Sequence, residues 1–256
     1  MIKGDFSRIQ CSPDLMPSDV LGTTVFNMKP NDFGFHQGPV FADLVLVDEI
    51  NRAPAKTQAA LFEVMEERQV SIDGTTHQMG ELYTILATQN PVEQEGTYKL
   101  PEAQLDRFLM KITMGYPSLE EEVDILERHH ANASWVKLES LTPVLTKEDL
   151  LSLRRLMEHV FVDRTLLQCI ALIVQQPRAS KAVYLGASPR ASVAMMQASK
   201  AYALLQGRDF VTPEDIKFVA PYVLQHRLIL TAEAEMEGYS PVKVTQRLID
   251  KVEVPK

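Results

Sequence analysis

The chain has 256 residues and a formal net charge of −8, with 45% hydrophobic and 23% charged residues. These values are typical of a folded globular protein of one large or two ordinary domains, and two fit better here. The acidic balance argues against a dominant sequence-independent grip on nucleic acid, so no nucleic-acid partner is expected. No apolar run approaches the ~18 residues that are needed to span a membrane, so no membrane-spanning segment is expected.

The two cysteines, Cys11 and Cys169, lie far apart and match no metal-binding or redox spacing. The first ten residues contain no apolar segment after their lysine, so no secretory signal is predicted. Both features are typical of a protein with reduced thiols. We therefore expect a cytoplasmic protein.

The first part of the chain alternates strand and helix patterns. Strands are predicted at 6–10, 44–47, 82–88 and 108–113, and the unbroken apolar run of 44–47 suits a parallel strand covered on both faces. A helix should follow Pro54, and a short helical stretch should cover 102–105. The segment 69–79, QVSIDGTTHQM, is typical of a hairpin that turns at Asp73 and Gly74. This alternation indicates an α/β layered domain.

After Pro117 the strand signals stop. Amphipathic segments follow at 118–131, 147–159, 163–176, 189–205 and 213–230. We therefore predict a helical second domain, with the boundary between 1–116 and 117–256. The tail after Gly238 is polar and weakly patterned.

Two adjacent carboxylates, Asp48 and Glu49, follow the apolar strand 44–47. In open α/β sheets, ligands bind at the carboxyl ends of the strands. In a phosphoryl-transfer site, Asp48 would hold Mg²⁺ through water and Glu49 would polarise the attacking water. The alternative is an apolar strand that ends in a solvated acidic loop.

Three further polar residues occupy positions that suit a nucleotide site. Asn90 follows strand 82–88 and could orient the same water, although an Asx turn before Pro91 would also explain it. Arg107 ends a short helical turn and is either a helix-terminal cation or a finger aimed at phosphate. Arg190 opens a predicted helix, where the helix dipole disfavours a cation, and this mildly favours a functional reason.

The ordered set LVLVDEINRAPAKTQAAL, LATQNPVEQEGTYKLPEAQLDRF and GASPRA resembles the MoxR family of AAA+ ATPases over nearly the whole chain. The resemblance implies a P-loop-type parallel sheet followed by a small all-helical lid. It makes Asp48 and Glu49 the Walker B pair, Asn90 the sensor 1 residue, Arg107 the arginine finger and Arg190 the sensor 2 arginine. Segment 13–41 resembles the insert before Walker B, and 69–79 the hairpin before sensor 1.

The resemblance also implies function. Family members bind ATP and Mg²⁺ and hydrolyse ATP in a ring, and here the ring is expected to be hexameric. They act as chaperones that remodel or mature a protein client. That client often carries a von Willebrand factor A domain. Two alternatives stay open: a non-hydrolysing scaffold subunit that supplies Arg107 in trans, and a DNA-translocating relative. The hairpin tip 73–77 carries no lysine or arginine, which weighs against DNA.

One motif departs from the family pattern. The chain contains no G-x-x-x-x-G-K-[ST] and no Gly-Lys dipeptide, so the first strand and the P-loop are expected to precede Met1. The missing strand would lie between 82–88 and 108–113. We therefore expect either a gap of roughly 10 Å between these strands or their direct pairing. We also expect Asp48, Glu49 and Asn90 to cluster at one edge of the sheet, with Arg107 on a surface remote from Asp48.

Overall fold

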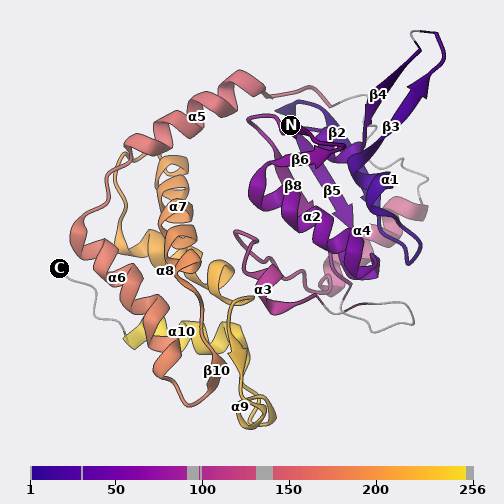
Figure 1. Ribbon diagram of the computed structural model, residues 1–256. Coiled ribbons are helices and arrows are strands. Elements are labelled where there is room, and N and C mark those ends of the chain that lie inside the picture. Colours follow the sequence, from indigo (N-terminus) through magenta and orange to yellow (C-terminus); the bar gives the residue numbers. More distant parts are fainter. Residues whose placement is uncertain (1, 30, 91–97, 99, 131–140, 252–256) are drawn as a thin grey trace.

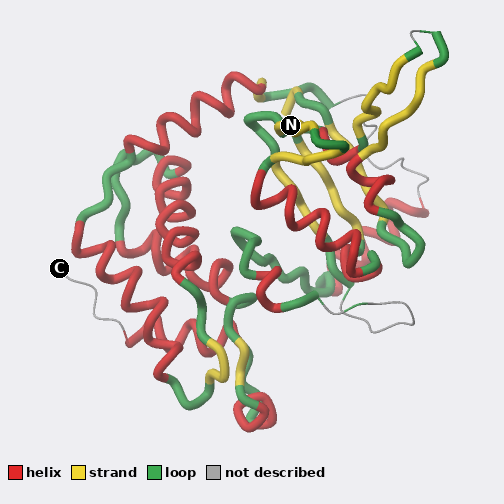
Figure 2. Tube along the Cα trace, in the orientation of Figure 1, coloured by secondary structure: helices red, strands yellow, loops and turns green. Residues whose placement is uncertain are grey.

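The structure, a computed structural model, describes residues 2–29, 31–90, 98, 100–130 and 141–251. The first half of the chain forms a core that contains the main sheet, and a helical lid lies beside it (Figure 1). Strands gather in the core and helices dominate the lid (Figure 2). Among the described residues, no helix is long and apolar enough to cross a membrane. The fold is therefore the expected α/β core followed by a helical lid region.

The core is built on a three-stranded parallel sheet in the order β2–β5–β8. Its strands are β2 (Phe6–Gln10), β5 (Leu44–Asp48) and β8 (Thr84–Ala87). In the middle strand β5, Val45 and Val47 are buried while Leu44 and Leu46 are only partly buried, so one face is covered more fully than the other, whereas both were expected to be covered. The register pairs Gln10 with Asp48 and Val47 with Ala87, so all three strands end at one edge. The strands predicted at 6–10, 44–47 and 82–88 are confirmed.

Helix α2 (Ala55–Glu67) begins directly after Pro54 and buries Leu61, Phe62 and Val64 in the core beneath the sheet. Strands β6 (Gln69–Ile72) and β7 (Thr75–Gln78) then form the predicted hairpin. Its turn residues Asp73 and Gly74 have φ of 49° and 78°. Positive φ at both residues is typical of the two-residue loops that join the strands of a hairpin. Helix α3 (Glu102–Leu105) is also present as predicted.

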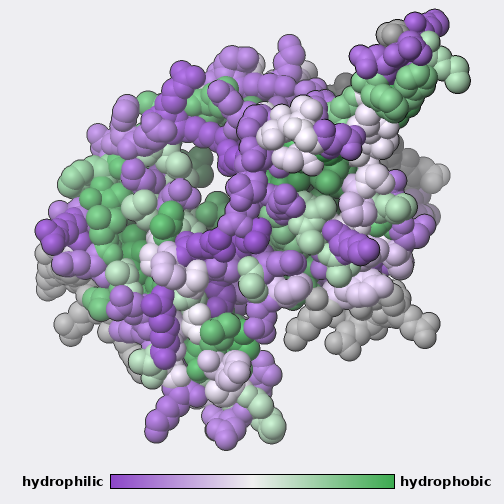
Figure 3. Space-filling view, in the orientation of Figure 1, coloured by the Kyte–Doolittle hydropathy of each residue, from purple (hydrophilic) through white to green (hydrophobic). Residues whose placement is uncertain are grey.

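Segment 13–41 folds into a short helix, a hairpin and a 3₁₀ turn. These are α1 (Pro17–Leu21), β3 (Gly22–Asn27), β4 (Asp32–Gln37) and η1 (Pro39–Phe41). The β3–β4 hairpin projects from the core (Figure 1), and apolar side chains line part of it (Figure 3). Near its base, the Thr24 hydroxyl donates to Asp73 at 2.5 Å, and the Phe35 ring stacks on His77 with centroids 4.2 Å apart. The two hairpins therefore touch each other.

The strand predicted at 108–113 is wrong, because these residues form no ladder with any described strand. A β-strand needs a neighbour to take its N–H and C=O groups, and β8 pairs only with β5 in the described sheet. Lys111 instead donates its backbone N–H to the Tyr222 carbonyl of the lid, at 2.9 Å. Direct pairing of 82–88 with 108–113, one of the two expected outcomes, is therefore not observed.

The described part of the lid is a bundle of helices with two buried clusters. The larger cluster includes Ile173, Met195 and Leu224, and the smaller includes Val183 and Leu230. The predicted amphipathic segments are confirmed as helices, although the last ends at Leu224 rather than at residue 230. The longer helices after Pro117 are α4 (Leu119–His130), α5 (Lys147–His159), α6 (Arg164–Gln175), α7 (Pro189–Leu205), α8 (Pro213–Leu224) and α10 (Pro241–Lys251).

Short strands depart from the sequence prediction, which placed none after Pro117. β10 (Val183–Leu185) pairs with β11 (Ile229–Leu230), and β9 (Leu145–Thr146) pairs with β1 (Ile2–Lys3) near the start of the chain. Strands of two or three residues are too short to show an alternating pattern. The remaining elements are η2 (Ile50–Arg52), η4 (Gln176–Ala179) and α9 (Ala232–Met236).

The weakly patterned tail after Gly238 contains helix α10, which packs against α8. It buries Val244 and Ile249. A proline at its first position was the available signal. The tail does not fill a place beside β8, where no described strand lies. The boundary between 1–116 and 117–256 stays a prediction.

Candidate active site

Asp48 ends the middle strand of the sheet and is held there by groups from both neighbouring strands. Its carboxylate accepts a hydrogen bond from the Thr88 hydroxyl, just beyond β8, and pairs with the Arg8 guanidinium of β2 at 2.5 Å. The hydrogen bond from Thr88 and the charge of Arg8 hold the pKa of Asp48 below its usual range. Asp48 is therefore an ionised, partly exposed carboxylate at the carboxyl edge of the sheet.

Glu49 has an unusual backbone conformation, with φ of 54° and ψ of 51°. The left-handed region is uncommon for residues other than glycine, and such conformations concentrate at functional sites. Its N–H donates to the Thr88 hydroxyl oxygen at 2.9 Å, while its carboxylate pairs with Arg52 at 3.0 Å. Gln10 donates to the same carboxylate oxygen at 3.3 Å. The chain thus turns sharply after β5 and sets the Glu49 carboxylate beside the strand ends.

Asn90 lies at the same edge, two residues beyond Thr88. The buried Asn51 donates its side-chain N–H to the Asn90 carbonyl at 3.0 Å, and Ile50 donates its backbone N–H to the Thr88 carbonyl at 3.0 Å. The segment after β8 is therefore tied to the segment after β5. The structure brings Asp48, Glu49 and Asn90 together at one edge of the sheet, and their catalytic roles stay predictions.

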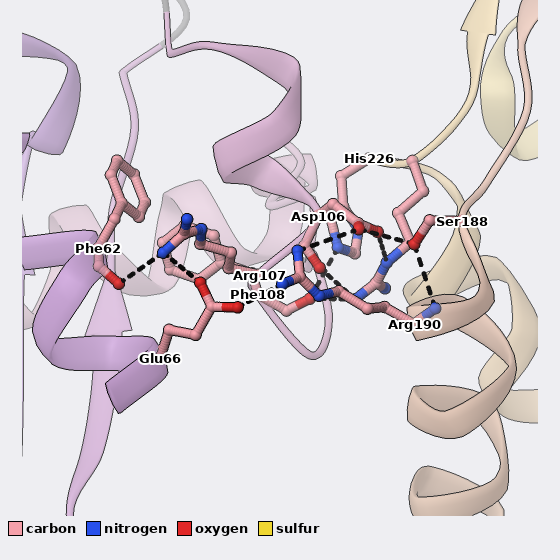
Figure 4. Close-up of polar contacts among 9 residues, drawn as sticks. Phe62, Glu66, Asp106, Arg107, Phe108, Ser188, Arg190 and His226 are labelled. Atoms are coloured by element: carbon pink, nitrogen blue, oxygen red, sulfur yellow. Dashed lines mark hydrogen bonds and ion pairs between the residues drawn. The ribbon is translucent and has the colours of Figure 1, made fainter. Parts of the chain in front are cut away.

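Arg107 and Arg190 meet on one carboxylate, that of Glu66 near the end of α2 (Figure 4). Arg107 follows α3 and also donates to the Phe62 carbonyl at 3.1 Å. Arg107 was expected on a surface remote from Asp48, and its guanidinium pairs within its own chain with Glu66 rather than with Asp48, with its side chain 30% exposed. This pairing suits a structural arginine, and a role in trans stays a prediction.

Arg190 is the second residue of α7, where the helix dipole disfavours a cation. Its guanidinium contacts the Glu66 carboxylate and lies 3.9 Å from that of Asp106. These two carboxylates offset the unfavourable position on the helix. The structure therefore supplies a local reason for Arg190 besides nucleotide binding, which stays a prediction.

Asp106 joins the core to the lid through a buried ion pair. Its carboxylate accepts from Arg227 Nε at 2.9 Å and from the Ser188 hydroxyl at 2.8 Å. The Arg227 side chain is 2% exposed and donates further hydrogen bonds to the carbonyls of Asp106, Phe108, Leu109 and Val223. Burial lowers the pKa of Arg227, while the Asp106 carboxylate raises it. This contact fixes the loop that carries Arg107 against the lid.

Sequence reasoning missed several residues of this site, namely Arg8, Asn51, Glu66, Thr88, Asp106 and Arg227. Arg8 and Thr88 are single polar residues in or next to a strand, and only the register of three strands places them beside Asp48. The signal for Asn51 was its position in the same run as Asp48 and Glu49. Glu66 lies in the segment Glu63–Glu67, which contains three glutamates and two apolar residues, and this pattern offered no signal to separate Glu66 from its neighbours.

The oxygen donors at the edge of the sheet fit the expected Mg²⁺. Asp48 and Glu49 supply carboxylates, the hard oxygen donors that Mg²⁺ prefers, and the Thr88 hydroxyl donates to the Asp48 carboxylate. No group of three or more His, Cys, Asp or Glu side chains able to hold a metal occurs in the described part of the chain. One or two carboxylates are nevertheless sufficient, because Mg²⁺ commonly keeps several waters and phosphate oxygens as its other ligands.

Comparison with known proteins identifies the family. Residues 1–110 match the model of the ATPase family associated with various cellular activities (AAA), and residues 175–250 match the AAA lid domain. Chaperone MoxR1 of Mycobacterium tuberculosis is 43% identical over 100% of this chain and 69% of its own length. The chain belongs to the MoxR family of AAA+ ATPases. Another relative of this MoxR-family chain, protein YeaC of Bacillus subtilis, is 48% identical over 99% of the chain and 78% of the relative.

A solved structure supports the same assignment of fold. The crystal structure of a candidate ATPase from Cytophaga hutchinsonii matches this MoxR-family chain with a TM-score of 0.89 and 41% sequence identity. The match covers 100% of this chain and 79% of the other. The parallel sheet and the helical lid are therefore an arrangement that a related protein also adopts.

Proposed function

We propose that this MoxR-type chain forms part of an ATP-binding and ATP-hydrolysing machine, with Asp48, Glu49 and Asn90 at the γ-phosphate. The observation that carries the proposal is the convergence of these three residues at the carboxyl edge of a parallel sheet. Ligands bind at this edge in open α/β sheets. The assignment agrees with the match to the AAA family model.

Each residue has a role that its geometry supports. The ionised Asp48 carboxylate would hold Mg²⁺, which neutralises charge on the phosphates when bound. The Glu49 carboxylate would accept a hydrogen bond from the attacking water and so make that water more nucleophilic. Asn90 would orient that water from the neighbouring strand. Arg190 would contact phosphate from the lid, and Arg107 would reach the nucleotide of an adjacent subunit.

The energy of hydrolysis would drive remodelling or maturation of a protein partner within a hexameric ring. The name of the 43% identical relative, Chaperone MoxR1, supports this activity class. A client with a von Willebrand factor A domain is the partner that the family resemblance suggests. The projecting β3–β4 hairpin carries exposed apolar side chains, including Phe26 and Phe33, which suits contact with another protein.

The proposal is tested by Glu49→Gln in the full-length protein. The amide keeps the shape of the side chain but cannot act as a base, so hydrolysis should fall by about 100-fold while ATP affinity changes little. Steady-state phosphate release and calorimetric titration measure the two quantities. Glu63→Gln, at an exposed position on α2, is the matched control. Unchanged turnover in Glu49→Gln would remove Glu49 from the proposed role.

A further inference from the structure

Glu66 holds two arginines that come from different parts of the molecule. One carboxylate oxygen pairs with Arg107 of the core, and the other pairs with Arg190 of the lid (Figure 4). Because both oxygens are used, each guanidinium is fixed relative to the other through a single side chain. Glu66 therefore sets the separation of the two cations that the proposed function assigns to nucleotide phosphates.

Glu66 neutralises part of the positive charge of the arginines around it. Three cations, Arg107, Arg190 and Arg227, face two anions, Glu66 and Asp106, in this cluster. Asp106 is already engaged by the buried Arg227 at 2.9 Å. Glu66 is thus the main counter-charge for Arg107 and Arg190, and its removal would raise the positive potential around both.

Exposure separates the movable part of the cluster from the fixed part. Arg227 is buried, whereas the side chains of Arg190 and Glu66 are 54% and 32% exposed. Exposed ion pairs are weak, and an incoming anion can exchange with the carboxylate. A phosphate group is such an anion, and the arginine guanidinium hydrogen-bonds to phosphate oxygens as it does to carboxylate oxygens.

We propose that Glu66 is a positioning residue that holds Arg107 and Arg190 together and competes with nucleotide phosphate for Arg190. The inference rests on the proposed function, because it concerns how ATP reaches an arginine that the chain already neutralises. Without Glu66, Arg190 meets phosphate with no competing carboxylate. Nucleotide should therefore bind more tightly when Glu66 is neutral.

The test measures binding of a non-hydrolysable ATP analogue with Mg²⁺ to the full-length protein by calorimetry. Glu66→Gln should lower the dissociation constant by about twofold to fivefold, as expected for loss of an exposed ion pair. The same substitution should have no effect in an Arg190→Gln background and should keep its effect in an Arg107→Gln background. Glu67→Gln, the next residue on α2 and also exposed, is the matched control and should leave the dissociation constant unchanged.

The outcomes separate this inference from the proposed function. If the unmodified protein binds no analogue, the proposed function fails and the inference fails with it. If the unmodified protein binds the analogue but Glu66→Gln does not tighten binding, the inference alone is overturned. It is also overturned if Glu66→Gln tightens binding equally in the Arg190→Gln background, or if the control Glu67→Gln tightens binding as much as Glu66→Gln does. Thermal melting checks folding, and loss of the fold in both Glu66→Gln and Glu66→Asp would assign Glu66 a structural role and overturn the proposal.

Discussion

Arg8 shows how a single side chain can set the conditions under which the site works. It lies on β2, one strand away from Asp48, and its guanidinium pairs with the Asp48 carboxylate at 2.5 Å. Mg²⁺ would need the same carboxylate. The Arg8 side chain is 57% exposed, so the pair is a weak one that a cation can displace.

Arg8→Gln should therefore make the proposed ATPase less demanding for Mg²⁺. The concentration of Mg²⁺ that gives half-maximal turnover should fall by about threefold, which is the scale of an exposed ion pair. Phosphate release measured over a series of Mg²⁺ concentrations gives this value. Arg155→Gln, at an exposed position on α5, should leave it unchanged. A higher Mg²⁺ requirement in Arg8→Gln would mean that Arg8 supports metal binding rather than competing with it.

The position of a candidate site residue could be predicted from the sequence only where the strand before it could be predicted. Asp48 and Asn90 each follow an apolar strand, so parallel pairing alone places them at one edge of the sheet. The partners of Arg107 and Arg190 could not be foreseen, because Glu66 is separated from Arg190 by 124 positions in the sequence. Long-range ion pairs depend on how the lid packs on the core, and no local pattern encodes that packing.

At the scale of secondary-structure elements, the loop after α3 is the joint between the core and the lid. Asp106, Phe108 and Leu109 all accept hydrogen bonds from Arg227, which lies beyond the end of α8. A buried charge that loses its partner is costly, because it has been removed from water without compensation. The stability of the joint therefore depends on Asp106.

Asp106→Asn should destabilise the chain by about 2–3 kcal/mol, since Arg227 would keep its carbonyl acceptors but lose its counter-charge. Urea unfolding followed by circular dichroism measures the free energy of unfolding. Asp124→Asn, on the exposed helix α4, is the control and should change it by less than about 0.5 kcal/mol. An Asp106→Asn variant as stable as the control would show that the carbonyl groups alone satisfy Arg227.

The same loop explains the main error in predicting elements. Residues 108–113 have the apolar pattern of a strand, but a strand is a property of a pair of segments and not of one. In the described structure these residues bond to the lid through Lys111 and Gln225 instead. Longer helices such as α6 and α7 were predictable because their caps and apolar spacing are local signals.

For the whole molecule, the packing of lid on core buries a titratable group. His226 follows α8, and one ring nitrogen lies 3.0 Å from the Phe108 carbonyl of the core. Its other ring nitrogen is buried without a hydrogen-bond partner among the described residues. Burial, followed by the charge of the adjacent Arg227, lowers the pKa of His226 from 6.5 to about 4. Lys111 lowers it further, while the Phe108 carbonyl and Asp106 oppose the shift.

This shift predicts how stability depends on pH. Because the folded pKa is lower than the unfolded one, the unfolded chain binds more protons between about pH 4 and pH 6.5. The contribution of His226 is therefore present above pH 6.5 and is lost as the pH falls toward 4. At pH 4.5 the loss relative to pH 7 should be about 2 kcal/mol from this residue alone.

His226→Gln removes the titration while keeping an N–H that can donate to the Phe108 carbonyl. Urea unfolding at pH 7 and at pH 4.5 should show that the variant loses about 2 kcal/mol less stability on acidification than the unmodified chain. Comparing the two proteins cancels the acid loss from carboxylates such as Asp48 and Asp215, whose pKa values are lowered in both. His129→Gln, on the exposed α4, should keep the full loss. Equal losses in the unmodified chain and in His226→Gln would mean that burial does not lower the pKa of His226 in the folded chain, and would overturn this prediction.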